Sequence, residues 1–189
     1  MNPSAHVAIG IILSSILLWL FQIDTSIVFL IVLGSIMPDF DFILSSYATN
    51  KNHRMLVTHT PVFWLLVLCL SALFQNFFFL AGAAIIHILF DTIDWGVMVA
   101  YPFSKKLNSH LLPEPPKNIL SKNMLQSQCW FFKTYFSNKL ILMIEVMSWC
   151  VATVFSLIFI SELWPYFIFY EVVVFVEIIF WNRCKKLAT

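Results

Sequence analysis

The apolar positions of this chain fall into six long runs, separated by short polar stretches. The runs cover residues 5–22, 26–44, 57–75, 77–100, 139–160 and 163–181. Each is close to the roughly 20 residues that a helix needs to cross a bilayer. In the second run Pro38 and two acids interrupt the apolar residues. This pattern predicts a short or broken helix whose end is buried in protein.

A seventh segment is amphipathic instead of uniformly apolar. After a stiff, proline-rich turn at 112–117, aromatic and aliphatic residues over 119–136 are interspersed with lysines, which predicts a helix lying on the membrane surface. We therefore expect an all-α polytopic membrane protein with about six transmembrane helices and one interfacial amphipathic helix. We expect one membrane domain over 1–189, with a core at 1–106, a cytoplasmic interfacial segment at 107–138 and two C-terminal transmembrane helices at 139–189.

The composition supports the membrane class. The chain is 60% hydrophobic and only 11% charged, with a mean hydropathy of +0.87, whereas soluble domains are about half apolar and about a quarter charged. The net charge of +1 gives no indication of a nucleic-acid partner. The first residues contain no cation and no cleavage site follows them, so the first run is interpreted as a retained helix.

The basic residues lie on one side of the predicted topology. With six helices, the N-terminus, the 45–56 loop, the 101–138 segment and the C-terminus share one face of the membrane, and this face carries all 11 Lys and Arg. They are Lys51, Arg54, Lys105, Lys106, Lys117, Lys122, Lys133, Lys139, Arg183, Lys185 and Lys186. The positive-inside rule then predicts that both termini are cytoplasmic, in the plasma or inner membrane of a prokaryote.

Histidines and aspartates gather at the same face. They are His6, His53, His59 and His87, together with Asp39, Asp41, Asp91 and Asp94. His87, Asp91 and Asp94 are spaced i, i+4 and i+7, so they share one face of a helix. Ionisable groups cost about 2.5–3.5 kcal/mol each at the centre of a membrane helix. Their convergence from several helices therefore predicts a metal site within a bundle.

Each residue also has a simpler interpretation. A single histidine in an apolar helix is usually a hydrogen-bonded packing residue. Asp39 and Asp41 could only cap a helix end, and His59 stands just before a helix start at Pro61. The combination favours a metal, because buried acids need partners and the nearby cations, Lys51 and Arg54, are too few for four carboxylates.

The ligand chemistry indicates a divalent metal, one or more ions, with zinc as the first choice. Such a site activates water and polarises a phosphoryl or acyl oxygen. We expect Arg54 to clamp a phosphate oxygen, although a headgroup-facing arginine fits equally well, and we assign catalytic roles also to Asp41 and Asp94. The scattered cysteines, Cys69, Cys129, Cys150 and Cys184, are predicted to be free thiols in a reducing cytoplasm.

Four short motifs resemble those of the YdjM-like (LexA-regulated) membrane-bound metal-dependent hydrolase family. They are Ala5-His6-Val7, Met37-Pro38-Asp39-Phe40-Asp41, His53-Arg54…Thr58-His59-Thr60 and His87-Ile88-Leu89-Phe90-Asp91. The resemblance covers roughly residues 1–106 and implies metal ligands at His6, Asp39, Asp41, His53, His59, His87 and Asp91. The chain departs from the family pattern in the spacing between His-Arg and Thr-His and in having Phe42 after the second acid. A fainter similarity to zinc-dependent phospholipase C implies phosphoester chemistry.

The preferred function is therefore a membrane-bound metal-dependent hydrolase that acts on a lipid or lipid-linked phosphate at the cytoplasmic leaflet. Its expected partners are membrane lipids and a lipid-like substrate, with no nucleic acid. One alternative is a transporter that binds an ion through the same His/Asp cluster, and another is a structural subunit. Glu145, Glu171 and Glu177 remain without an assigned role; Glu171 could complete the site or act as a general base, or be protonated and bonded to a neighbouring helix.

Overall fold

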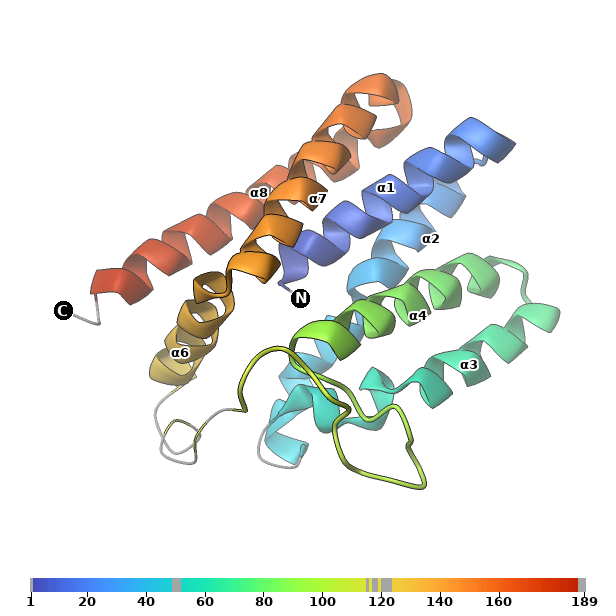
Figure 1. Cartoon of the computed structure of the whole chain (residues 1–189). Helices are drawn as coiled ribbons and strands as arrows, with labels where there is room; N and C mark the ends of the chain where they lie inside the picture. Colours follow the sequence, from blue (N-terminus) through green and yellow to red (C-terminus); the bar gives the residue numbers. More distant parts are fainter. Residues whose placement is uncertain (1, 49–51, 115, 117–118, 120–123, 187–189) are drawn as a thin grey trace.

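The computed structural model describes residues 2–48, 52–114, 116, 119 and 124–186, and this part of the chain is helical without any strand. The α-helices are α1 (Pro3–Phe21), α2 (Thr25–Ile36), α3 (Pro61–Cys69), α4 (Asn76–Asp94), α6 (Met124–Ser137), α7 (Lys139–Ile158) and α8 (Ile160–Lys186). The 3₁₀ helices are η1 (Met37–Tyr47), η3 (His53–Met55), η4 (Val57–His59) and η5 (Leu70–Ala72). The all-α prediction is confirmed (Figure 1).

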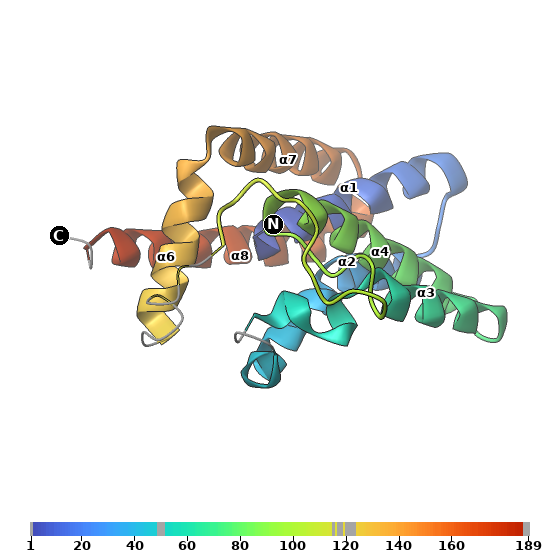
Figure 2. The same cartoon turned by 60° about the horizontal axis from the view of Figure 1, so that its bottom comes forward.

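The helices form a bundle in which α2 packs between α1 and α4, and α3 folds back along α4 (Figures 1 and 2). On its other side α1 packs against α7 and α8, and α6 contacts the same two helices. The first turn of α1 and the last turns of α8 lie at one end of the bundle, together with η1, η3 and η4 (Figure 1). The predicted site residues therefore share this end.

Glycine allows two helix pairs to approach closely. A Cβ atom at Gly10 would lie 2.4 Å from Oγ of Ser35, so α1 and α2 meet there. A Cβ atom at Gly34 would lie 2.3 Å from the backbone oxygen of Leu80, so α2 and α4 meet there. Small residues at helix interfaces are the usual means of tight packing in membranes, where the hydrophobic effect does not drive helices together. These contacts bring Ser35 and α4 close together beside the site.

The predicted break in the second helix is confirmed. The α-helical hydrogen bonding of α2 ends at Ile36, and the chain continues as the 3₁₀ helix η1 from Met37. Pro38 removes one backbone donor and favours a first-turn position, which explains why the change falls here. As a result, Asp39 and Asp41 are placed on a tighter helix with a different side-chain register.

Five helices are long and apolar enough to cross a membrane: α1, α2 with η1, α4, α7 and α8. The third run, predicted to span over 57–75, differs because its apolar helix covers only Pro61–Ala72. Thr60 is extended, as expected of a residue before proline, so the helix cannot continue backward through His59. Among the described residues, five helices therefore have the length and hydropathy of a span, and the shorter apolar helix Pro61–Ala72 stands in the place of the sixth.

The amphipathic helix forms as α6, whose described part begins at Met124; residues 120–123 lie outside the described residues. It crosses near the end of α8 (Figure 2), where Cys129 and Cys184 form a disulfide. The prediction of free thiols is therefore wrong for this pair, and it holds for Cys69 and Cys150. The two bonded cysteines are 55 positions apart in the sequence and gave no local signal, because only the packing of α6 on α8 brings them together.

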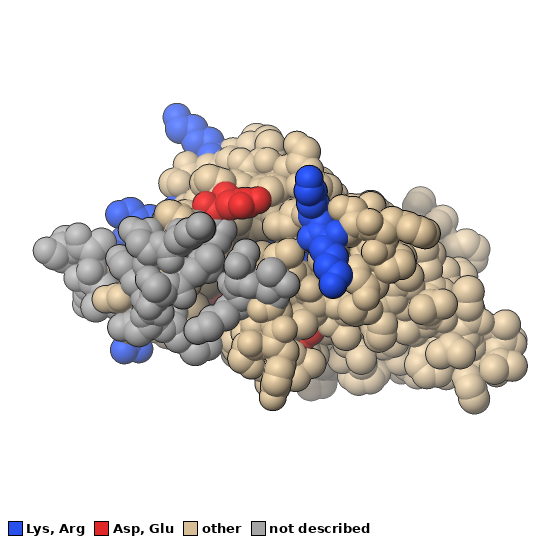
Figure 3. All heavy atoms as spheres, turned by 90° about the horizontal axis from the view of Figure 1, so that it is seen from below, with Lys and Arg blue, Asp and Glu red and all other residues tan. Residues whose placement is uncertain are grey.

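The basic residues of the described chain surround the end of the bundle that holds the site. Figure 3, viewed from this end, shows Lys and Arg side chains at several separate places on the surface. Exposed examples are Lys105, Lys106, Lys133, Lys139 and Arg183. The predictions made for Lys51, Lys117 and Lys122 fall outside the described residues.

Candidate metal centre

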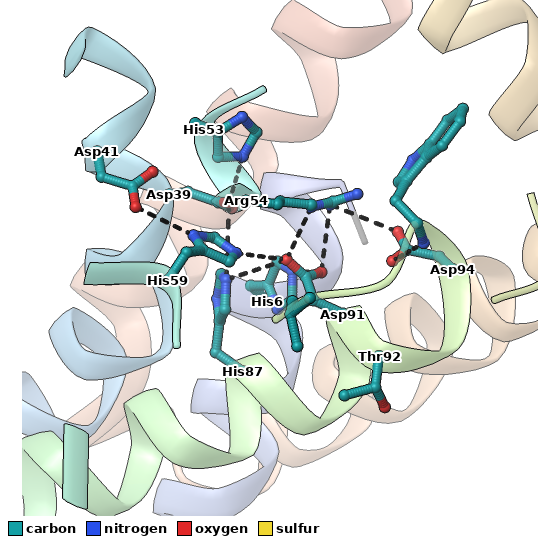
Figure 4. A network of polar contacts seen from close by, with 12 residues as sticks. His6, Asp39, Asp41, His53, Arg54, His59, His87, Asp91, Thr92 and Asp94 are labelled. Atoms are coloured by element: carbon teal, nitrogen blue, oxygen red, sulfur yellow. Dashed lines mark hydrogen bonds and ion pairs between the residues drawn. The ribbon is translucent and has the colours of Figure 1, made fainter. Parts of the chain in front are cut away.

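The structure brings all of the predicted site residues into one polar network (Figure 4). The network draws on α1, η1, η3, η4 and α4, which contribute His6, Asp39, Asp41, His53, Arg54, His59, His87, Asp91 and Asp94. Most of these side chains are buried, and His6, His59 and Asp91 have no exposed surface at all. Such a dense set of buried ionisable groups needs strong mutual compensation.

Asp91 lies at the centre of the network. Its carboxylate oxygens lie 3.1 Å from Nε2 of His6 and 2.8 Å from Nε2 of His59. Nε of Arg54 lies 3.2 Å from the same carboxylate, and Nε2 of His87 lies 3.5 Å from it. The i, i+4 spacing of His87 and Asp91 therefore places both on the inner face of α4, as the sequence predicted.

His87 presents a nitrogen lone pair to the centre of the cluster. Its Nδ1–H donates to the backbone oxygen of Ser35 at 2.6 Å, which leaves Nε2 unprotonated in the neutral ring. Nε2 is buried and has no hydrogen-bond partner among the described residues. The nearest polar atoms are carboxylate oxygens of Asp39, at 3.6 Å, and Asp91. Nε2 therefore faces two carboxylates across a gap that a proton or a metal cation can fill.

His59 is oriented by two carboxylates. Its Nδ1 lies 3.3 Å from Asp41, and its Nε2 contacts Asp91. Thr58 donates its hydroxyl to the same oxygen of Asp41 at 2.7 Å, which fixes that carboxylate. Burial alone would lower the pKa of His59, but the hydrogen bonds with Asp41 and Asp91 raise the pKa to about 9. Without a metal, His59 therefore carries a proton that a metal ion would displace.

Two sets of side chains lie close enough together to hold a metal ion. One consists of Asp39, His59, His87 and Asp91, and the other of Asp41, His53 and His59; within each set the donor atoms lie within 4.8 Å of one another. Mixed imidazole and carboxylate donors suit zinc and other divalent transition metals. The orphaned lone pair of His87 points into the first set, so these residues fit a metal.

Arg54 lies inside the network and does not reach outward to solvent. It is 6% exposed, and its guanidinium contacts Asp91 as well as Asp94, the latter at 3.6 Å. Burial opposes the charge of Arg54, but the neighbouring carboxylates raise its pKa above the ordinary value. In this geometry Arg54 neutralises two acids. The predicted contact with a phosphate oxygen would have to use the guanidinium N–H groups that do not face these acids.

The edge of the site is formed by His53 and Asp39. Their side chains are 27% and 17% exposed, and His53 Nε2 lies 3.8 Å from the Asp39 carboxylate. Burial lowers the pKa of His53, so this ring is neutral at physiological pH. Since the other cluster residues are nearly fully buried, this edge is the one place in the described network where the site meets its surroundings.

Sequence reasoning missed the residues that orient the ligands. Ser35 is an ordinary polar residue in the sequence, and Thr58, although part of one of the four motifs, is not linked to Asp41 by any spacing. Glu145 and Glu177 carried the one available signal, since an acid within a membrane segment is a functional candidate. The structure places both near the N-terminus of α1, and Glu171 instead accepts from Nε1 of Trp149 at 3.2 Å, away from the cluster.

The fold and the site together define a polytopic all-helical membrane protein with a buried His/Asp cluster at one end of its bundle. The chain belongs to the YdjM inner membrane protein family, whose model matches residues 1–174. This confirms the resemblance seen in the motifs, and the match extends through α7 and into α8, beyond the predicted 1–106. Neither the curated proteins nor the solved structures gave a match.

Proposed function

We propose that this protein is a membrane-bound metal-dependent hydrolase that acts on a lipid or lipid-linked phosphate at the cytoplasmic leaflet. The observation that carries the proposal is the buried Nε2 of His87, which lies 3.6 Å from Asp39 and 3.5 Å from Asp91 without a hydrogen bond to either. His59 completes this set. A site that only fixed helix packing would be expected to satisfy this nitrogen with a donor.

The residues of the site divide into those that would bind the metal and those that orient the metal ligands. Asp39, His59, His87 and Asp91 would hold the metal, with zinc expected from the donor set. When bound, the metal supplies a Lewis acid that activates water and polarises a phosphoryl oxygen. Asp41 orients the His59 ring and Ser35 orients that of His87, as partners of ligating histidines usually do. His53, at the exposed edge, is placed to accept a proton from an entering water.

An apolar groove beside the cluster supports a substrate with a hydrocarbon chain. The groove has a volume of about 350 Å³ and lies between α1, α4 and α7, lined by residues such as Ile9, Phe90, Met143 and Met147. The groove shares α1 and α4 with His6 and Asp91, although no residue of the cluster lines it. An acyl chain in this groove would lie along the two helices that carry His6 and Asp91.

The arrangement of charge supports the cytoplasmic leaflet. The Lys and Arg side chains of the described chain surround the end of the bundle that holds the cluster (Figure 3). By the positive-inside rule this end faces the cytoplasm, where anionic headgroups also attract basic side chains. Both termini are therefore proposed to be cytoplasmic.

The test is hydrolysis by purified protein in mixed micelles. Wild type should release phosphate from a lipid phosphate faster than from a matching soluble ester, lose this activity with a chelator and recover it with added zinc. His87→Ala should be inactive, whereas His110→Ala should keep its activity, because within the described part of the chain His110 bonds to the Asn108 backbone oxygen, outside the cluster. A metal-loaded wild type without activity on any phosphoester would overturn the hydrolase proposal.

One observation favours transport as a second function. The change from α2 to η1 within an apolar segment resembles the broken helices at the ion sites of transporters. Metal-dependent uptake of zinc or manganese into liposomes by wild type, absent in His87→Ala and unaccompanied by hydrolysis, would favour this function over the first.

A further inference from the structure

The first turn of α1 lacks a cap of its own. Asn2 occupies the position before the helix, and its side chain makes no capping hydrogen bond. The first backbone N–H groups of a helix have no partner within it, and a buried helix start needs a substitute. His6 sits in this same turn, so whatever fixes the turn also fixes His6.

The substitute cap comes from α8. The backbone N–H of Ser4 donates to Oε1 of Glu177 at 3.1 Å, and the Ser4 hydroxyl donates to Oε2 at 2.6 Å. Ser4 is 4% exposed, so the contact is shielded from solvent on that side. A carboxylate is the favoured partner here, because the N-terminus of a helix carries a partial positive charge. The contact joins residues that are 173 positions apart in sequence.

A second contact fastens the same turn to α6 and α7. The backbone N–H of Asn2 donates to the hydroxyl oxygen of Tyr135 at 3.1 Å. The Tyr135 hydroxyl in turn donates to Glu145 of α7. Two acids of the C-terminal helices thus bind the start of α1, one directly and one through a tyrosine.

The first turn of α1 bears directly on the metal cluster. Nε2 of His6 contacts Asp91, and the His6 ring stacks on the His87 ring with centroids 3.6 Å apart and an interplanar angle of 22°. His6 is completely buried. A shift of the turn by a fraction of an ångström would therefore change the positions of the Asp91 carboxylate and the His87 ring together.

We propose that Glu177 is a positioning residue of the metal cluster: its carboxylate holds the first turn of α1 through Ser4 and thereby sets His6 against Asp91 and His87. This role rests on the proposed metal site. It also assigns a part in that site to the C-terminal end of α8, which lies beyond the 174 residues that match the family. Partners of metal ligands usually change affinity by about 10–100-fold when removed.

The test compares two acids of the same helix. Glu177→Ala should bind cobalt, used as a spectroscopic probe, about 10-fold more weakly than wild type, with an altered ligand-field spectrum and unchanged stoichiometry. Glu177→Gln keeps an acceptor for the Ser4 N–H and should restore wild-type binding. Glu171→Ala is the matched control, because Glu171 contacts Trp149 and no cluster residue, and it should bind cobalt like wild type.

The decisive variant is the double substitution with His6→Ala. If Glu177 acts through His6, then Glu177→Ala should weaken binding no further once His6 is removed. An undiminished effect in the His6→Ala background, or wild-type affinity in Glu177→Ala, would overturn the proposal. Should Glu177→Ala fail to fold, Glu177→Asp keeps the charge but draws the carboxylate back from both Ser4 donors by one methylene, and a wild-type affinity and spectrum in that variant would overturn the proposal equally.

A measurement on the metal-free protein distinguishes a failure of this proposal from a failure of the proposed metal-dependent function. Diethyl pyrocarbonate modification of His6, mapped by mass spectrometry, should be slow in wild type and in Glu171→Ala and clearly faster in Glu177→Ala. If wild type bound no cobalt while this contrast held, the metal function would fail and the positioning of His6 by Glu177 would stand. Equal protection of His6 in all three proteins would overturn the positioning role.

Discussion

The helices that carry the motifs and the two C-terminal helices differ in how much protein surrounds them. In the apolar stretch of α1, 56% of the residues are buried within the structure. The buried share is 17% in the corresponding stretch of α7 and 11% in that of α8. The motif helices hold almost all of the buried charge, and α7 and α8 expose large apolar side chains outward. The difference follows from solvation, because a charge cluster needs protein on all sides in a bilayer and an apolar helix does not.

The comparison also shows that the outer helices are not merely a hydrophobic cover. Each contributes an acid that turns inward: Glu145 binds Tyr135, and Glu177 binds Ser4. The inner helices and the short 3₁₀ helices thus contribute the residues of the cluster, and acids of the outer helices hold the first turn of α1 in place. The predictions below contrast matched positions in these two regions.

The largest effect on folding free energy is expected for Arg54, and Arg183 serves as its control. Arg54→Ala removes the cation that faces Asp91 and Asp94, and breaking a buried pair in this way costs about 3–5 kcal/mol of folding free energy. Arg183→Ala, at an exposed position of α8, should change it by less than about 0.5 kcal/mol. Thermal unfolding in detergent measures both, and equal melting temperatures for the two variants would contradict the buried network.

The next effect is a pH dependence of metal binding. Burial opposes the charge of His59, but Asp41 and Asp91 raise its pKa from 6.5 to about 9, with His53 and His87 also facing the ring. This proton stabilises the metal-free fold fully below pH 6.5, and the contribution is lost as pH rises to about 9. A metal must displace the proton, so its affinity should rise up to about tenfold per pH unit in this window and then level off.

Calorimetric titration with zinc at several pH values checks this expectation in buffers of different ionisation enthalpy. Proton release that accompanies binding should be seen at pH 7 and should disappear above pH 9. An affinity that does not change between pH 7 and pH 9 would show that His59 is already neutral and that Asp41 and Asp91 do not hold its proton.

A smaller effect separates two glycines. A Cβ atom at Gly34 would meet the backbone of Leu80 at 2.3 Å, so Gly34→Ala should push α2 from α4 and cost about 1–3 kcal/mol. Gly82 has nothing within 4 Å of that position, and Gly82→Ala should be neutral or stabilise the helix by up to about 1 kcal/mol. Denaturation of both variants measures their free energies of unfolding, and equal values would contradict the close contact between α2 and α4 at Gly34.

Sequence periodicity and residue chemistry predicted much of the fold and of the site. The six apolar runs, the break at Pro38 and the grouping of His87 with Asp91 follow from local rules that act within a few residues. The cluster itself was predictable because charges are so unfavourable in a membrane that their positions are informative.

One error is local: the third run is shorter than predicted because Pro61 holds Thr60 extended. The other errors concern long-range packing. The roles of Ser35 and Glu177 depend on which helices touch, and no local pattern encodes that. For the same reason the pairing of Cys129 with Cys184 could not be seen.

The smallest effect is expected for this disulfide, which fastens α6 to α8 in the outer region. In purified, non-reduced and denatured protein, a thiol reagent should label Cys69 and Cys150 alone, and all four cysteines after reduction. Cys129→Ser should change zinc affinity by less than about twofold, because additivity is expected for sites without shared partners, and Cys69→Ser serves as its control.

The same labelling in cells sharpens the proposed topology. Structural disulfides are rare in the cytoplasm, where thiols are kept reduced. Cells quenched with a membrane-permeant reagent test the proposed orientation against the disulfide of the structure, because a cytoplasmic face would keep Cys129 and Cys184 reduced until lysis without reductant. A pair that is already oxidised in quenched cells would contradict the cytoplasmic orientation, because it would place the ends of α6 and α8, and with them the metal cluster, on the oxidising side of the membrane.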